Sequence, residues 1–351
     1  MQPQTAVITG EVFEKHRPPG YSHPERPARV RVIREEAARL ASDGIVALLE
    51  PRSVPLEEAT RVHDQDYVGM VAEASEYPQY LDPDTYVGPG SLEAALHALG
   101  TAYEAARLAY EGRYRVVYAA VRPPGHHAGK RRAAGFCLFN NIAYAAQRMI
   151  EDHGLKRIAI IDVDAHWGDG TAEIFYDRRD VLYISFHQDP RTLYPGRGFP
   201  EELGRGEGLG YTVNIMMPPL ATDQLYLKAW HEIAMPILER YKPQLILVSL
   251  GFDAHKDDPL TDLALTLEGY WALLREVLVL AERLTGRGLA LMLEGGYDLR
   301  VLRDGVRVVA SLTEEEPPVR EESVEAPGET VGRFRRFVER VKKALEPYWE
   351  L

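Results

Sequence analysis

The chain of 351 residues lacks features that several protein classes require. Its single cysteine, Cys137, excludes an intrachain disulfide framework. No apolar run approaches the roughly 18–20 residues that a membrane-spanning helix needs. The first residues carry neither the basic segment nor the apolar segment of a secretory signal peptide. Together these absences predict a cytoplasmic protein with no membrane partner.

Positive charge is also scarce. The chain has 41 Lys and Arg against 53 Asp and Glu, a formal net charge of −12. Nucleic-acid binding requires concentrated Lys and Arg, so no nucleic-acid partner is expected. Hydrophobic residues make up 45% of the chain, which is enough for a packed core and excludes a mostly disordered protein.

Short apolar runs rich in Val and Ile alternate with segments of helical periodicity. This alternation predicts an α/β fold in which helices cover both faces of a parallel sheet. The expected strands are 4–9, 115–121, 157–164, 181–187, 245–253 and 288–294. The expected helices are 91–110, 141–153, 223–241 and 266–284, with Ser91 and Thr266 as N-caps. An acidic, Pro-rich loop at about 314–330 and a helix at about 331–349, expected to dock on the body, complete the chain.

One segment, Asp162 to Gly170, starts in an apolar strand and ends in a Gly-rich turn. Side chains two residues apart in an extended chain point to the same side, so Asp164 and His166 can converge on one cation. A further carboxylate, Asp253, ends another apolar strand. These three residues would make an Asp₂His set with open positions, which is typical of a catalytic metal site. Zinc is the first expectation, and Fe(II) or Co(II) accepts the same ligands.

Two other motifs follow strands. His126 and His127 are adjacent in a Pro/Gly-rich loop, where they are either metal ligands or acid/base groups held by carboxylates. Asp162 and Asp169 would supply one carboxylate each. Tyr297 follows two glycines that allow a sharp turn, and it would serve as a hydrogen-bond donor beside the metal. Alone, this last motif is also an ordinary turn.

Six motifs in one order carry a family resemblance: RPPGHHA, GFCLFNNIA, DVDAHWGDGT, SFHQDPRTLYPGRG, VSLGFDAHKDDPL and EGGYD. Together with SHPERP at 22–27, they resemble the histone deacetylase family, including acetylpolyamine amidohydrolases, over about residues 16–310. The details are closer to class II and acetylpolyamine-type members. The resemblance implies a three-layer α/β/α arginase-like fold with a mostly parallel central sheet, built as a single domain over residues 1–351.

The resemblance also implies roles for individual residues. The zinc ligands would be Asp164, His166 and Asp253. The catalytic residues would be His126, His127, Asp162, Asp169 and Tyr297. The substrate tunnel would include Gly135, Phe136, Tyr194 and Leu260. A structural potassium ion would be held by Asp162, Asp164, His166, Ser185 and Phe186. The sequence departs from common family members at Trp167, which often is a second histidine, and at Glu294, which often is glycine.

The implied reaction is hydrolysis of an N-acetyl amide to acetate and a free amine. Leu260 favours an acetyl-lysine substrate, because polyamine-selective members of the class II type place a glutamate at this position. An acetylpolyamine or a small acetylated metabolite is the alternative substrate. Negative charge around the tunnel mouth could attract a polyamine, and four acidic residues could supply it: Asp82, Asp84, Asp257 and Asp258. A homodimer also stays open, since acetylpolyamine-type relatives are often dimers.

Two other functions are less compatible with the sequence. A binuclear manganese ureohydrolase needs an acid two residues after the ligand histidine, where Gly168 stands. It also needs paired acids after Phe252, where the sequence reads Asp-Ala-His. A non-enzymatic sensor of acetylated ligands should have lost a metal ligand or Tyr297, and none is lost.

Overall fold

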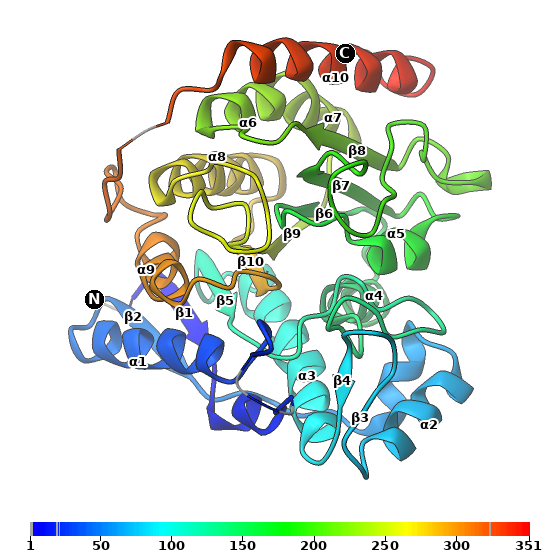
Figure 1. Ribbon diagram of the computed structural model, residues 1–351, viewed down its shortest axis with the longest axis vertical. Helices are drawn as coiled ribbons and strands as arrows, with labels where there is room; N and C mark the ends of the chain where they lie inside the picture. Colours follow the sequence, from blue (N-terminus) through cyan, green and yellow to red (C-terminus); the bar gives the residue numbers. More distant parts are fainter. Residues whose placement is uncertain (1–2, 19, 21, 323) are drawn as a thin grey trace.

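An eight-stranded parallel sheet forms the centre of the molecule (Figure 1). The computed structural model describes residues 3–18, 20, 22–322 and 324–351. The strand order is β2-β1-β5-β10-β9-β6-β7-β8, and every neighbouring pair is parallel. The strands are β1 (Thr5–Ile8), β2 (Val46–Leu49), β5 (Val116–Ala119), β6 (Ile158–Asp162), β7 (Val181–Gln188), β8 (Thr212–Met217), β9 (Leu245–Leu250) and β10 (Leu289–Leu293).

Helices cover both faces of the sheet and bury one apolar core on each side. One face is packed by α2 (Gln65–Ala74), α3 (Ser91–Tyr110), α4 (Asn141–His153) and α5 (Asp169–Phe175). The other is packed by α1 (Ala28–Ser42), α6 (Asp223–Ala229), α7 (Met235–Tyr241), α8 (Leu267–Thr285), α9 (Leu299–Ala310) and α10 (Gly328–Leu345). The predicted three-layer α/β/α architecture is confirmed.

The six predicted strands are present, each within a residue or a few of its expected bounds. The sequence missed β2 and β8, the two edge strands. β2 has only four residues. Although residues 45–49 are all apolar, Leu48 is 37% exposed, so β2 is not fully buried as the central strands are. β8 directly follows a glycine-rich stretch that reads as a loop.

The helix predictions need two corrections. The predicted helix at 223–241 contains a π-helical segment, Trp230–Ala234, between α6 and α7. Thr266 caps α8 as predicted, because its Oγ1 accepts a hydrogen bond from the Gly269 amide at 3.0 Å. Ser91 is not an N-cap. Gly90 holds that position with a φ of +89°, and Ser91 is the first residue of α3.

The C-terminal helix α10 begins at Gly328, three residues before its predicted start, and ends at Leu345. It packs on β8 and α6 through buried apolar residues such as Phe334 and Val341, as the docking prediction required (Figure 1). The acidic segment before it has no helix or strand among its described residues, and Ser323 lies outside them. No helix in the described part of the chain is both long and apolar enough to cross a bilayer.

Four adjacent strands, β5, β10, β9 and β6, position the candidate site. A polar motif follows each of them in the sequence. The carboxyl ends of parallel strands lie at one edge of a sheet, so these motifs meet there. A small antiparallel ribbon of β3 (Gln79–Tyr80) and β4 (Tyr86–Val87) brings the 81–85 turn to the same edge.

Candidate active site

Asp164 and His166 follow β6, and Asp253 follows its neighbour β9. Their ligand atoms all lie within 4.8 Å of one another. His166 Nδ1 is 2.8 Å from Asp253 Oδ2 and 3.2 Å from Asp164 Oδ1. A Cβ on Gly251 or Gly295 would lie 2.1 Å or 2.6 Å from Asp164 Oδ2, so only glycine leaves room at either position. The arrangement fits a single cation held by two carboxylates and one imidazole.

The electrostatics of this group favour a positive charge. Burial raises the pKa of Asp253 to about 7, and the neighbouring Asp164 carboxylate raises it as well. Burial lowers the pKa of His166, but hydrogen bonds to Asp164 and Asp253 outweigh it and bring this pKa to about 10. Two buried carboxylates facing one another therefore stabilise a cation, either a proton on His166 or a metal ion.

Each of the two adjacent histidines has its own carboxylate. His126 Nδ1 lies 3.0 Å from Asp162 Oδ2, and His127 Nδ1 lies 2.7 Å from Asp169 Oδ1. Arg132 also donates to Asp169, at 2.7 Å. Each histidine is thus paired with its carboxylate through Nδ1, which leaves Nε2 on the opposite side of the ring.

The two histidines differ in their charge. Burial lowers the pKa of His126, but the Asp164 and Asp162 carboxylates raise it well above its ordinary value. Burial lowers the pKa of His127 to about 4, and the adjacent His126 lowers it further against the opposing effect of Asp169. His127 is therefore neutral near pH 7 and has a free nitrogen lone pair.

Glu294 is a functional candidate that the sequence showed only as a departure. It is fully buried at the end of β10, where its Oε2 accepts the amides of Gly125 and His126 at 2.7 and 3.1 Å. Its Oε1 accepts the Ser249 hydroxyl at 2.9 Å. Burial raises the pKa of Glu294 to about 7. The side chain ties the histidine loop to β9 and β10, and an acid closing an apolar strand was the signal for it.

Tyr297 is held by contacts that do not involve its hydroxyl. Its amide donates to Asp258 Oδ2 at 2.8 Å, and its ring lies edge-on to Phe136 with centroids 5.9 Å apart. The Arg29 guanidinium lies 5.0 Å from the ring centroid. Burial raises the pKa of Tyr297 well above its ordinary value, so the phenol stays protonated as a donor.

A buried ion network holds the loop before Tyr297. Arg29 donates to the carbonyls of Glu294 and Gly296 at 2.5 and 2.7 Å and pairs with Glu25 at 3.0 Å. Arg122 also pairs with Glu25, through two hydrogen bonds. All three charged side chains are essentially unexposed. The network connects α1 to the loops after β5 and β10. In the sequence, its only indication was the SHPERP motif, which contains Glu25.

Comparisons with known proteins agree with this geometry. Residues 23–313 match the histone deacetylase domain family. The chain belongs to that family. Over 300 residues it is 41% identical to a probable deacetylase of Archaeoglobus fulgidus, covering 84% of this chain and 82% of the relative. A histone deacetylase-like amidohydrolase of Pseudomonas aeruginosa is 37% identical over 80% of this chain and 74% of its own length. The crystal structure of the HDA15 HD domain superposes with a TM-score of 0.86 at 33% identity, covering 98% and 96% of the two chains.

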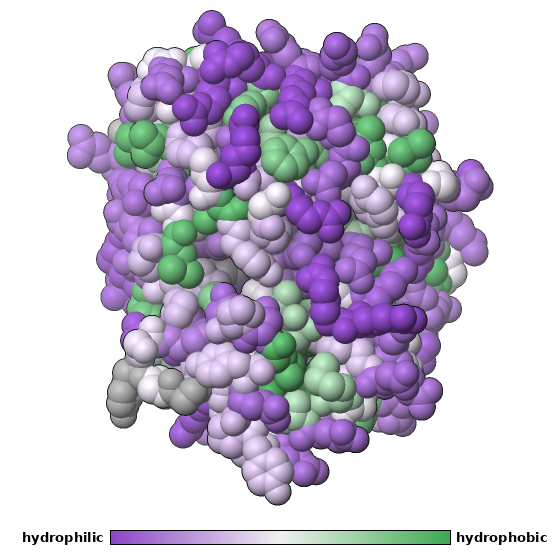
Figure 2. All heavy atoms as spheres, turned by 45° about the vertical axis from the view of Figure 1, so that its right-hand side comes forward, coloured by the Kyte–Doolittle hydropathy of each residue, from purple (hydrophilic) through white to green (hydrophobic). Residues whose placement is uncertain are grey.

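The candidate site borders a cavity of about 390 Å³. All four predicted tunnel residues line it, together with His126, His127, His166 and the following: His23, Pro24, Asp84, Pro124, Leu193, Gly295 and Tyr297. Tyr194 packs edge-on against His127 with centroids 5.1 Å apart. On the side that Figure 2 brings forward, which carries β3, β4 and α5, apolar residues form small patches among hydrophilic ones.

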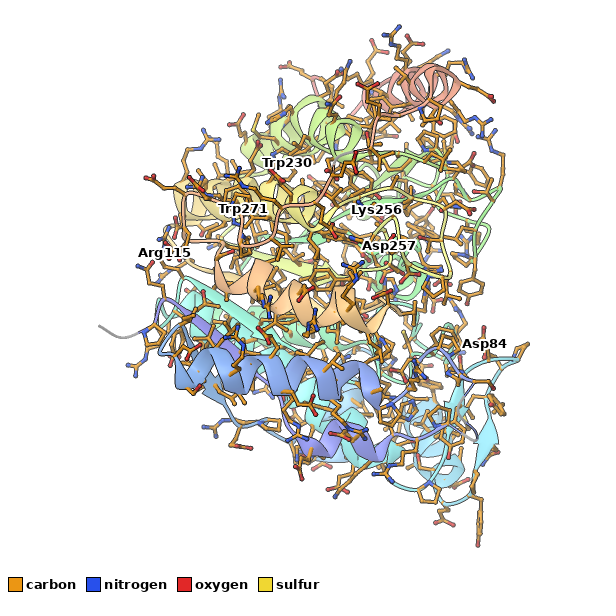
Figure 3. The ribbon with its side chains drawn as sticks, turned by 60° about the vertical axis from the view of Figure 1, so that its left-hand side comes forward. Asp84, Arg115, Trp230, Lys256, Asp257 and Trp271 are labelled. Carbon is orange, nitrogen blue, oxygen red and sulfur yellow. The ribbon has the colours of Figure 1, made fainter. Side chains whose placement is uncertain are left out.

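The expected ring of acids at the mouth of this deacetylase is smaller than the sequence suggested. Asp84 lines the cavity, whereas Asp257 does not line it and pairs with Arg300; Figure 3 shows the two acids well apart. Asp258 is only 7% exposed. Its two carboxylate oxygens accept hydrogen bonds from the backbone amides of Leu260 and Tyr297, which compensate for the loss of water. Asp258 is thus a loop-holding residue and not a screened surface charge, which corrects the prediction.

His255, two residues after Asp253, does not line the cavity. It is fully buried, and its Nε2 lies 2.9 Å from Glu321 Oε2. Its Nδ1 accepts the Asp257 amide, and Arg300 lies within 3.4 Å of Glu321 and contacts Asp257. Arg300 already supplies a positive charge beside Asp257 and Glu321. Through His255 and Arg300, the acidic segment that contains Glu321 is connected to the loop that follows Asp253.

The remaining predicted residues lie behind the cavity. Ser185 and Phe186 are buried in β7, and Ser185 pairs in register with Asp162 of β6. Ser185 Oγ lies 2.9 Å from His187 Nδ1. The potassium assignment stays a prediction.

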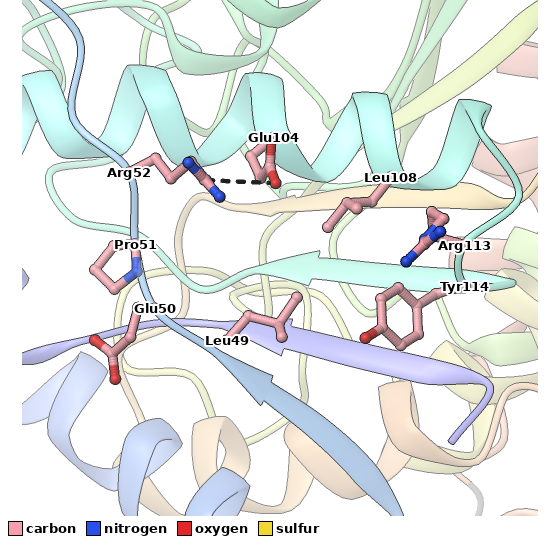
Figure 4. A pocket seen from close by; sticks show the side chains of 8 residues that line it. All are labelled: Leu49, Glu50, Pro51, Arg52, Glu104, Leu108, Arg113 and Tyr114. Carbon is pink, nitrogen blue, oxygen red and sulfur yellow. Dashed lines mark ion pairs between the residues drawn. The ribbon is translucent and has the colours of Figure 1, made fainter. Parts of the chain in front are cut away.

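A second hollow, of about 500 Å³, lies beside β2 and α3 (Figure 4). It contains an ion pair between Arg52 and Glu104 at 3.5 Å. None of the predicted site residues lines it. The predicted site residues that border a cavity therefore lie at the other one.

Proposed function

We propose that this chain is a zinc-dependent deacetylase that hydrolyses the N-acetyl amide of an acetyl-lysine type substrate to acetate and a free amine. The observation that carries the proposal is that His126, His127, His166 and Tyr297 line one cavity, where each histidine is backed by carboxylates: the two His–Asp pairs and the Asp₂His set. We further propose that the 351 residues act as one deacetylase domain.

The residues proposed to hold zinc are Asp164, His166 and Asp253. Their donor types and mutual distances fit the metal, and two glycines leave the room it needs. When bound, such a cation supplies Lewis acidity toward an amide carbonyl and lowers the pKa of a water molecule. Fe(II) or Co(II) would be accepted by the same donors. A structural potassium ion is proposed beside Asp162 and Ser185, whose positions adjoin across β6 and β7.

His127 is proposed as the general base and then the general acid. Its low pKa keeps it neutral, so its Nε2 can take a proton from water and later pass it to the leaving amine. Asp169, at 2.7 Å from Nδ1, fixes the tautomer and stabilises the imidazolium that forms. His126 is proposed to carry positive charge beside the reacting atoms, an effect that a bound cation would weaken by repulsion.

Tyr297 is proposed to donate a hydrogen bond to the oxyanion of the tetrahedral intermediate. Its hydroxyl stays protonated near neutral pH, because burial raises its pKa well above its ordinary value. A preorganised donor of this kind is worth about 10²–10³ in rate.

The cavity walls favour a substrate with an aliphatic stem. Phe136, Tyr194 and Leu260 offer apolar or aromatic surface, while only Asp84 of the four candidate acids lines the cavity. Such surface suits the methylenes of lysine. An acetylpolyamine or a small acetylated metabolite is the alternative, and Asp84 is the feature that favours a cationic tail.

Substrate choice is tested by comparing kcat/KM for an acetyl-lysine peptide, N-acetylspermidine and N-acetylputrescine at about 0.05 M and 0.5 M salt. We expect the peptide to be preferred at both salt concentrations. In Leu260→Glu the preference should move toward acetylspermidine, and Leu260→Gln serves as the uncharged control. A parent preference for acetylpolyamine that fades with salt would make Asp84 the selector and overturn the substrate assignment.

A further inference from the structure

We propose that Trp167, the residue after His166, is a positioning residue that fastens the 189–203 loop and thereby sets the place of Tyr194 in the cavity wall. This inference rests on the proposed function for its kinetic consequence, but its structural consequence is independent of that function. Trp167 itself does not line the cavity, and it is only 2% exposed. It therefore acts through the loop.

The indole of Trp167 is the surface on which the loop lies. A Cβ on Gly198 would be 2.6 Å from Trp167 Cγ, and the φ of Gly198 is +97°, so the loop backbone touches the ring at a position that requires glycine. The Arg197 guanidinium lies 5.5 Å from the ring centroid. The indole thus contacts the loop through the backbone at Gly198 and through a cation placed over its ring.

Hydrogen bonds fix the loop to the same point. Trp167 Nε1 donates to Asn214 Oδ1 at 2.8 Å. The Asn214 amide nitrogen donates in turn to the carbonyls of Phe199 and Glu202 at 3.0 and 2.9 Å. Glu202 Oε1 accepts the amides of Gly198 and Phe199 at 2.8 and 3.0 Å. The Trp167 indole thus orients the side-chain amide of Asn214, a residue of β8. That amide in turn donates to two carbonyls of the loop.

Tyr194 lies four residues before this anchor. Its side chain is 46% exposed, and its ring meets the catalytic-loop residue His127 edge-on. A half-exposed aromatic side chain on a loop keeps one position only if the backbone near it is held. Loosening the anchor at Gly198 therefore shifts the wall that Tyr194 forms, while the ligand set stays in place.

The test replaces one hydrogen-bond donor and follows both loop and site. Trp167→Phe keeps an aromatic ring and removes Nε1–H. Asn214→Asp keeps the acceptor for the indole and removes the donor to Phe199 and Glu202. Trp271→Phe is the matched control, because its indole donates to the Ser311 carbonyl at 3.1 Å on the far side of α8.

Loop mobility is read by limited trypsin cleavage of the zinc-loaded chain, counting cuts after Arg191 and Arg197, whose side chains are 54% and 60% exposed. We expect Trp167→Phe to raise these cleavage rates about fivefold, the factor that one buried hydrogen bond is worth, and Asn214→Asp, which loses two such bonds, to raise them at least as much. KM for an acetyl-lysine peptide should rise by a similar factor, with kcat within about twofold and zinc content unchanged. The control should behave as the parent.

Unchanged cleavage in Asn214→Asp, whose fold is checked by near-UV circular dichroism, would overturn the proposal even if Trp167→Phe fails to fold. Loss of zinc in Trp167→Phe with an intact loop would also overturn it, because Trp167 would then serve the ligand set. If the parent does not hydrolyse the peptide, the proposed function fails, and the cleavage rates alone decide the loop assignment.

Discussion

Replacing Tyr297 by phenylalanine removes one hydroxyl while leaving the ring in place. The backbone amide is held by Asp258 at 2.8 Å, and the ring rests against Phe136 and Arg29. None of these contacts uses the hydroxyl. Because burial keeps the pKa of Tyr297 high, the hydroxyl is a protonated donor in the parent at working pH. The variant therefore isolates the one donor that we propose for the oxyanion.

The expected loss in kcat is about 10²–10³, or about 2.7–4 kcal/mol of transition-state stabilisation. An interaction made only in the transition state lowers kcat and kcat/KM equally, so KM should not change. The assay is acetate release from an acetyl-lysine peptide, with zinc measured on the same sample. Tyr103→Phe is the control, since its hydroxyl donates to Asp152 at 2.6 Å between α3 and α4. A Tyr297→Phe enzyme with parental kcat and full zinc would refute the oxyanion role.

Two further predictions concern acid stability and metal content. Burial lowers the pKa of His63 to about 4. Below pH 6.5 the unfolded chain therefore binds a proton at His63 that the folded chain does not, so the free energy of unfolding decreases as the pH falls. Groups such as Glu294, whose pKa burial raises to about 7, change stability in the opposite sense, so the parent must be compared with His63→Gln. The free energy of unfolding in urea is measured for both proteins. Between pH 7.0 and 5.5 the difference between them should shift by about 1 kcal/mol in favour of His63→Gln, and no shift would contradict the low pKa of His63. Asp253→Ala removes one of three metal donors and should lose most of its zinc; full occupancy would exclude Asp253 as a ligand.

The central strands and the convergence of Asp164, His166 and Asp253 were predictable because both follow from local rules. Buried parallel strands are continuous apolar runs, and side chains alternate along them with a period of two. Asp164 follows β6 and Asp253 follows β9, so the two carboxylates lie close together because the strands are neighbours. Edge strand β2 escaped prediction although residues 45–49 are all apolar, because so short a run does not by itself distinguish a strand from a buried helix segment.

Residues whose partners lie far along the chain could not be assigned from the sequence. Arg29 holds carbonyls more than 260 residues away, and nothing near it in the sequence distinguishes it from the other arginines of α1. Asp258 stands in a charged, Pro-containing stretch typical of solvent-exposed loops. It is buried because the amides of Leu260 and Tyr297 compensate its charge.

The most direct test of the account measures metal stoichiometry and acetate release on one sample. The chain is purified, loaded with zinc, freed of excess metal and given an acetyl-lysine peptide. The account predicts one zinc ion per chain, held by Asp164, His166 and Asp253, and release of one acetate for each free lysine amine formed. Two metal ions per chain without acetate release, or acetate release that persists after the metal is fully removed, would contradict it.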